Sequence, residues 1–140
     1  MKLIQLIYVS TARHLLDEQE IRKILDSSIR HNTLQEVTGL LLYSNGSFMQ
    51  VLEGEESAVD ETMSRIEKDA LHYDVLVLTK SPVSHREFGN WAMGFRGIVA
   101  KDAESWPSYA PFFENGFSAQ KIGAQSGLAL EILKNFAELN

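Results

Sequence analysis

The sequence has 140 residues, a length that fits one domain, and its hydrophobic (44%) and charged (23%) fractions are typical of a soluble globular protein. No apolar run approaches the ~20 residues that a membrane helix needs, and the apolar stretch after Lys2 is too short for a signal peptide. The formal net charge of −6, without a cluster of Lys and Arg, argues against direct binding of nucleic acid.

The sequence contains no cysteine, which excludes disulfides, thiolate metal sites and cysteine nucleophiles. This composition fits a cytoplasmic protein. The four histidines, His14, His31, His72 and His85, do not have the spacing of zinc ligands, so we predict no metal site.

The first predicted element is a strand over residues 3–10 (LIQLIYVS), which is rich in β-branched and aromatic side chains. Asp17 and Glu20 then have the spacing of a capping box, so we expect a helix with Ile24 on its apolar face. This helix is expected to end near residues 30–33.

Asn45-Gly46 is a strong hairpin signal, and it joins predicted strands over residues 38–43 and 47–53, the second of them stopped by Gly54. Three more elements follow, a helix over 57–69 with Ser57 and Asp60 at cap spacing, and strands over 74–79 and 90–95.

The order β-α-β-β-α-β-β predicts an α+β domain over residues 1–97, with a ferredoxin-like sheet, one extra strand and two helices on one face. We expect the first and third strands to be parallel neighbours at the sheet centre. Residues 98–140 predict a C-terminal helical extension that packs on the sheet or on a partner. Trp106-Pro107, Pro111 and Asn115-Gly116 interrupt it, and its last helix begins near Gly127.

Alternation of side chains along the strands places Tyr8 and Gln50 on one face, beside each other on neighbouring strands, with Phe48 on the same face. The same rule places Trp91 and Met93 together on one face of the fifth strand. Gln5 falls on the opposite sheet face, where we expect it to be exposed or at an interface.

Polar residues also gather where the two helices are expected to meet, because His31 and Asn32 lie at the end of the first helix. Ile24 and Ile66 would form apolar walls of a slot for a planar aromatic ligand. Two further residues on the second helix could reach a polar tail of such a ligand: Arg65 and Asp69.

Each of these residues also has an ordinary interpretation. Tyr8 alone is most often a core tyrosine, Gln50 an exposed residue at a sheet edge, and Arg65 with Asp69 a surface ion pair. The pattern alone therefore indicates a ferredoxin-like domain with a pocket.

Several short motifs occur in order between residues 6 and 95: Tyr8-Val9-Ser10, His31-Asn32, Thr38–Tyr43 (TGLLLY), Phe48–Gly54 (FMQVLEG), Arg65-Ile66 and Asn90–Met93 (NWAM). Each motif is weak alone, but their joint order and spacing resemble the BLUF family, the sensors of blue light using flavin.

The resemblance implies a bound flavin, with FAD as the usual form and FMN and riboflavin as alternatives. It implies that Tyr8 donates an electron and a proton to the excited flavin, and that Gln50 bridges Tyr8 and the flavin. Asn32 and His31 would contact the ring. The resemblance also implies that Ile24 and Ile66 are the walls and that Ser28 lies near Gln50. It implies that Trp91 and Met93 are a photoactive pair, one packed near Gln50 and the other turned away, in either order. Phe48, Arg65 and Asp69 are the remaining expected flavin contacts.

In such a receptor, light leaves a rearranged Gln50 amide, by rotation or tautomerisation, and red-shifts the flavin absorption. The fused enzymes of the family carry cyclase or phosphodiesterase domains, and we see no room for one after residue 95. We therefore expect no enzyme activity, output through an unknown protein partner, and a homodimer.

Two other classes remain open from the residues alone. One is a small ferredoxin-like enzyme of the acylphosphatase or monooxygenase type, although Thr11-Ala12-Arg13 lacks the glycines of a phosphate cradle. The other is a colourless interaction module. A yellow preparation that red-shifts reversibly in blue light would distinguish the receptor from both.

Overall fold

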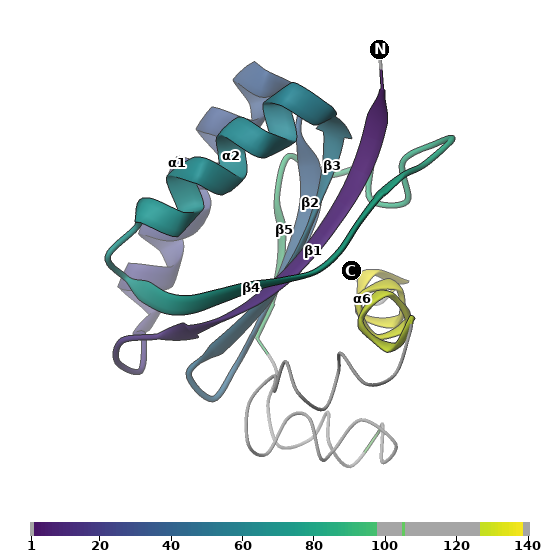
Figure 1. Cartoon of the computed structure of the whole chain (residues 1–140). Coiled ribbons are helices and arrows are strands. Elements are labelled where there is room, and N and C mark those ends of the chain that lie inside the picture. Colours follow the sequence, from purple (N-terminus) through teal and green to yellow (C-terminus); the bar gives the residue numbers. More distant parts are fainter. Residues whose placement is uncertain (1, 98–104, 106–126, 139–140) are drawn as a thin grey trace.

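The fold is a five-stranded sheet between two helical layers (Figure 1). The computed structural model describes residues 2–97, 105 and 127–138. Helices α1 and α2 cover one sheet face and α6 lies against the other. The elements are β1 (Leu3–Ala12), α1 (Glu18–Gln35), β2 (Thr38–Ser44), β3 (Ser47–Glu55), α2 (Glu56–Lys68), β4 (His72–Pro82), β5 (Gly94–Gly97) and α6 (Leu128–Glu138).

The predicted capping box at the start of α1 is confirmed. Asp17 accepts a hydrogen bond from the Glu20 amide at 2.8 Å, and the Glu20 carboxylate accepts one from the Asp17 amide at 3.3 Å. The predicted caps of α2 are wrong, because this helix follows β3 directly, with Glu55 as an N-cap that makes no side-chain bond.

The strand order is β4-β1-β3-β2-β5, so β1 and β3 are neighbours as predicted, but they are antiparallel and not parallel. The crossover through α1 makes β1 and β2 point the same way, and the hairpin at Asn45-Gly46 reverses β3, which lies between them. The parallel pair in this sheet is β2 with β5.

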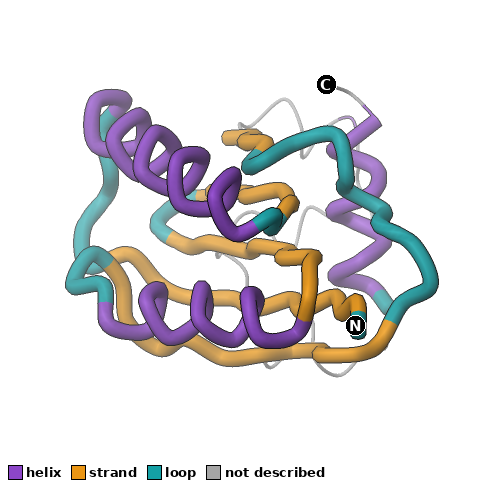
Figure 2. The backbone as a smooth tube through the Cα atoms, turned by 90° about the horizontal axis from the view of Figure 1, so that it is seen from above, coloured by secondary structure: helices purple, strands orange, loops and turns teal. Residues whose placement is uncertain are grey.

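The two sheet faces carry separate cores. Under α1 and α2 lie Ile4, Leu6, Tyr8, Phe48 and Leu52 with the buried residues of the helices. Under α6 lie Ile7, Val9, Leu40, Met49 and Val51 with Ile132, Leu133 and Phe136 of that helix. Figure 2 shows the helix next to the C-terminus set apart from the other two.

α6 therefore covers the sheet face opposite α1 and α2, and it begins directly after Gly127, as predicted. The breaks expected at Trp106-Pro107, Pro111 and Asn115-Gly116 lie outside the described residues. Within the part of the chain that is described, no helix is both long enough and apolar enough to cross a membrane.

The prediction for Gln5 is wrong. Gln5 does lie on the far face, but it is buried, because its amide donates a 2.9 Å hydrogen bond to the carboxylate of Glu53 on the neighbouring strand.

The fifth strand is shorter and later than predicted, since β5 covers Gly94–Gly97 and the segment 90–93 is not a strand. Trp91 and Met93 consequently do not share a face. Met93 belongs to the core under α1 and α2, and Trp91 packs against the core under α6.

Candidate functional site

Tyr8 and Gln50 are direct partners in the β1–β3 ladder, and both are almost fully buried. The Tyr8 hydroxyl donates to Gln50 Oε1, and Gln50 Nε2 donates to Met93 Sδ at 3.1 Å. A thioether sulfur has no hydrogen to donate, so the NH₂ side of the Gln50 amide must face Met93. The three side chains thus form one directed chain of hydrogen bonds.

Above this chain lie two adjoining cavities of about 70 and 230 Å³, which together approach the size of a small-molecule pocket. Ile24 of α1 and Ile66 of α2 line both, and Gln50 contributes to both from the sheet. The arrangement provides apolar walls on two helices and a polar floor on two strands, which suits a flat aromatic ring with polar edges.

Asn32 is the buried polar residue of α1, and it lines the larger cavity. Its Nδ2 donates to the Ala92 carbonyl at 3.0 Å, and a carbonyl only accepts. The orientation of the amide is therefore fixed, with the side-chain oxygen left as an acceptor for a ligand N–H group.

The outer end of the site is charged. Exposed Arg65 and Asp69 line the larger cavity from α2 and its C-cap, and Lys23 lines it from α1. The two cationic side chains, Lys23 and Arg65, outnumber the one carboxylate, Asp69, so the charge at this end favours a ligand whose polar tail is negatively charged.

His31 is one step removed from the cavities, because its Nε2 lies 3.5 Å from Oγ1 of Thr62, and Thr62 lines the larger one. Loss of hydration, and then the nearby Arg65, lower the pKa of His31, whereas Glu61 opposes this change. A lowered pKa favours the neutral ring, in which one nitrogen donates and the other accepts.

Burial is the main cause that raises the pKa of the Tyr8 hydroxyl above its ordinary value, and the carboxylate of Asp69 adds to it. The hydroxyl therefore keeps its proton at any pH near neutral and remains the donor in the bond to Gln50.

His72 is a site residue that the sequence did not reveal. Its Nε2 lies 2.5 Å from the Ile66 carbonyl, so Nε2 carries a hydrogen, and its Nδ1 lies 2.8 Å from Ser10 Oγ. The ring stands edge-on to Tyr8 and Phe48, at 6.4 and 6.2 Å between centroids. The predicted fourth strand began too late to include it.

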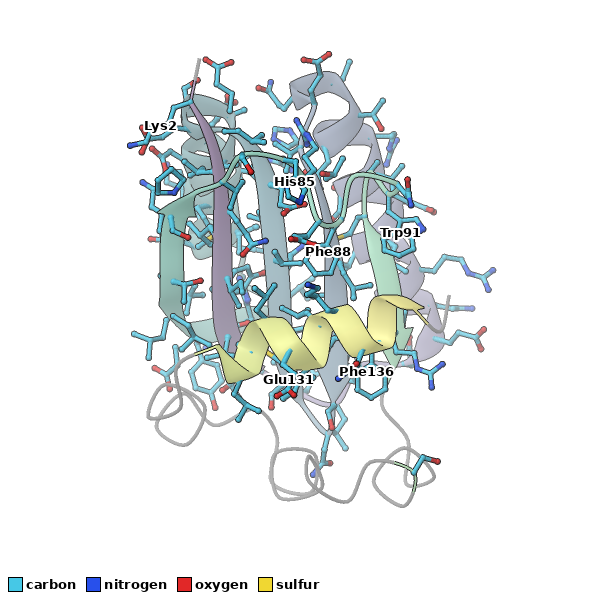
Figure 3. All side chains as sticks on the ribbon, turned by 90° about the vertical axis from the view of Figure 1, so that its right-hand side faces the viewer. Lys2, His85, Phe88, Trp91, Glu131 and Phe136 are labelled. Carbon is cyan, nitrogen blue, oxygen red and sulfur yellow. The ribbon has the colours of Figure 1, made fainter. Side chains whose placement is uncertain are left out.

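The structure brings most of the predicted residues to the two cavities: Tyr8, Ile24, Ser28, Asn32, Phe48, Gln50, Arg65, Ile66 and Asp69. Met93 joins them through Gln50, whereas Trp91 lies on the α6 side of the sheet (Figure 3). Lining residues that were not predicted are Lys23, Ser27, Leu41, Thr62, Leu71 and His72.

Known proteins resemble this chain. It is 34% identical over 89 residues to photoactivated adenylate cyclase subunit alpha of Euglena gracilis, which covers 64% of this chain and 9% of that protein. It is 34% identical over 91 residues to the blue light- and temperature-regulated antirepressor BluF of Escherichia coli (strain K12), which covers 63% of this chain and 22% of that protein. The chain thus spans less than a quarter of either relative.

The dark-state structure of the BLUF protein BlrB superimposes with a TM-score of 0.68 at 29% identity, covering 88% of this chain and 96% of that one. The family model described as sensors of blue-light using FAD matches residues 3–94, which is about two thirds of the chain and includes the strands and helices that form the cavities. The chain therefore belongs to the BLUF family, the sensors of blue light using FAD.

Proposed function

We propose that this protein is a blue-light receptor that holds its flavin between Ile24 and Ile66, above the Tyr8–Gln50 pair. The observation that carries the proposal is the directed chain of hydrogen bonds from the Tyr8 hydroxyl through the Gln50 amide to the Met93 sulfur, in which Tyr8 and Gln50 line the cavity. Family membership favours this reading over a small ferredoxin-like enzyme or a colourless interaction module.

The residues of the cavity fit a flavin ring. The ring edge presents both N–H and carbonyl groups, which suit the free oxygen of Asn32 and the amide of Gln50. Lys23 and Arg65 at the outer end suit a phosphate-bearing tail, so we propose FAD as the ligand, with FMN as the second choice and riboflavin, which has no phosphate, as the third.

When bound, the flavin supplies absorption of blue light and a strongly oxidising excited state. Tyr8 is the neighbouring donor, and its raised pKa keeps the hydroxyl protonated in the dark. Gln50 then stores the change, since the two ends of its amide have nearly the same size and opposite hydrogen-bonding character.

The reversed Gln50 amide affects Met93 directly. If the amide oxygen faces the sulfur, neither atom carries a hydrogen, so the bond from Gln50 to Met93 is lost. Exchange of bonds worth about 1 kcal/mol each is enough to shift a segment between two positions of similar free energy. Met93 precedes β5 directly, so this strand is the first element to respond.

We further propose that the protein is not an enzyme and signals by binding another protein. Euglena relatives that share this domain are named as adenylate cyclase subunits, and an Escherichia coli relative is named as an antirepressor. The homodimer remains a prediction.

The test replaces Gln50 with leucine, which keeps the volume and removes both hydrogen bonds. The Gln50→Leu protein should still bind flavin and should lose the reversible red shift in blue light. The matched control is Gln5→Leu, a buried glutamine on the opposite sheet face, which should keep the shift. A normal photocycle in Gln50→Leu contradicts the proposal.

A further inference from the structure

Glu53 is a fully buried carboxylate on β3 that the proposed photochemistry does not use. Its side chain points to the sheet face under α6, whereas that of Gln50 points to the cavity face. The Glu53 carboxylate accepts three hydrogen bonds. Phe88 N donates to Oε1 at 2.7 Å, while Glu87 N at 3.0 Å and Gln5 Nε2 at 2.9 Å donate to Oε2. A buried carboxylate is tolerated when its oxygens are paired in this way, so Glu53 is a fixed anchor for the backbone at 87–88.

Arg86 reinforces the same anchor from the neighbouring position. Its guanidinium donates to the Glu53 carbonyl at 2.9 Å, to Thr38 Oγ1 at 2.8 Å and to the Glu36 carbonyl at 2.7 Å. Residues 86–88 are thus tied to β3, to the start of β2 and to the C-cap of α1.

Residues 91–93, a few positions later in the chain, are bound by residues on the side of the sheet that carries the cavities and by Gly39 of β2. The Trp91 carbonyl accepts from the Gly39 amide at 3.1 Å, and the Ala92 carbonyl accepts from Asn32. Met93 accepts from Gln50. The segment 86–93 is therefore bound to Glu53 on the far sheet face at its start. At its end, on the cavity face, it is bound to Gln50 by the contact that light is proposed to break.

Phe88 connects the anchor to the far core. It is 1% exposed and belongs to the cluster that contains Ile132 and Phe136 of α6. Figure 3 shows Phe88 and Trp91 on the sheet face that α6 crosses. The fixed end of the segment is therefore embedded in a closely packed core.

We propose that Glu53 is a positioning residue for the photocycle: it holds residues 87–88 in place, so that Met93 stays close to Gln50 after light has broken their contact. The inference rests on the proposed function. A tethered Met93 returns to Gln50 quickly because little conformational freedom has to be removed again. Loosening the anchor should therefore slow the return to the dark state.

The first test is Glu53→Gln, which keeps the shape but turns one acceptor oxygen into an NH₂ group that faces an N–H donor. Flavin binding and the size of the red shift should stay as in the unchanged protein. Dark recovery should slow about fivefold, the equivalent of one hydrogen bond of about 1 kcal/mol.

The control is Gln5→Leu, which removes the third bond to the same carboxylate without touching residues 86–93. Its recovery should change by less than about twofold. A purely structural role would lower the stability of both variants and leave both recovery rates alike, which would overturn the inference. If the unchanged protein shows no reversible red shift, the proposed function fails and the role of Glu53 falls with it.

Hydrogen exchange on the unchanged protein gives a second test that does not depend on folding of a variant. In blue light the Gly39 amide, which donates to Trp91, should lose protection, while the amides of Glu87 and Phe88 stay protected. Loss of protection at Glu87 and Phe88 together with Gly39 would show that the anchor moves, and would overturn the proposal.

Discussion

The two faces of the sheet are packed differently. The face under α6 is closed, and Ile132, Leu133 and Phe136 are fully buried in it. The face under α1 and α2 contains cavities, and its helical walls, Ile24 and Ile66, remain partly exposed. One side of the sheet is therefore a closely packed core, and the other is a site with room for a ligand.

β3 connects these two environments because neighbouring side chains on a strand point to opposite faces. Gln50 faces the cavity and donates to Met93, while Glu53 faces the far core and binds residues 87–88. Side chains of β3 thus bind both ends of the segment 86–93, and this segment links the two faces of the sheet.

The largest effect is expected from Tyr8→Phe, which tests whether the cavity face carries the photochemistry. The substitution removes the hydroxyl that donates to Gln50 and should abolish the reversible red shift, measured by absorption before and after blue light. Tyr43→Phe is the control, since Tyr43 packs on Phe48 at 5.0 Å in the same core and its hydroxyl accepts from Leu16. A full red shift in Tyr8→Phe would exclude this residue as the donor.

The second prediction compares the two faces directly. Leu133→Ala in the closed core should lower the free energy of unfolding by about 2–5 kcal/mol, whereas Ile66→Ala at the cavity wall should cost only about 1 kcal/mol in the flavin-free protein. Ile66→Ala should instead weaken flavin binding. Urea unfolding and flavin titration measure the two effects, and equal losses of stability would refute the distinction.

The third prediction concerns Gly39, where β2 passes close to β3. A Cβ at this position would lie 1.9 Å from the Val51 carbonyl oxygen and 3.4 Å from Met93 Cε. Gly39→Ala should therefore destabilise the protein by about 1–3 kcal/mol, because the backbone of β3 at Val51 must move away from the added methyl group. Gly97→Ala is the control, since among the described residues the nearest atom to its Cβ, in Phe95, is 3.8 Å away, and a change within about 0.5 kcal/mol is expected.

Side-chain alternation correctly predicted that Tyr8 and Gln50 are neighbours, because the β1–β3 ladder that joins them has a uniform register. The same rule failed for Trp91 and Met93. The backbone at 91–92 bonds to Gly39 and to the side chain of Asn32 instead of continuing a ladder, so its side chains do not alternate. Those contacts join residues more than 50 positions apart, and local patterns do not contain them.

Buried polar pairs were also missed. Gln5 was expected to be exposed or at an interface because it falls on the sheet face opposite Tyr8, but it is buried there, and Glu53 lies directly opposite it in the ladder. The predicted direction of β3 relative to β1 was wrong for a different reason. The direction follows from combining the crossover through α1 with the hairpin at Asn45-Gly46, and no single residue determines it.

The last prediction concerns the buried Tyr8 hydroxyl and the stability of the protein at alkaline pH. The folded protein keeps the Tyr8 proton where the unfolded chain, with a tyrosine pKa of about 10, releases it. This contribution to stability is complete below about pH 10 and is lost as the pH rises above it, by at most about 1.4 kcal/mol per pH unit. Tyr8→Phe should remove this component of the pH dependence. Identical alkaline profiles for Tyr8→Phe and the unchanged protein would contradict the raised pKa of Tyr8.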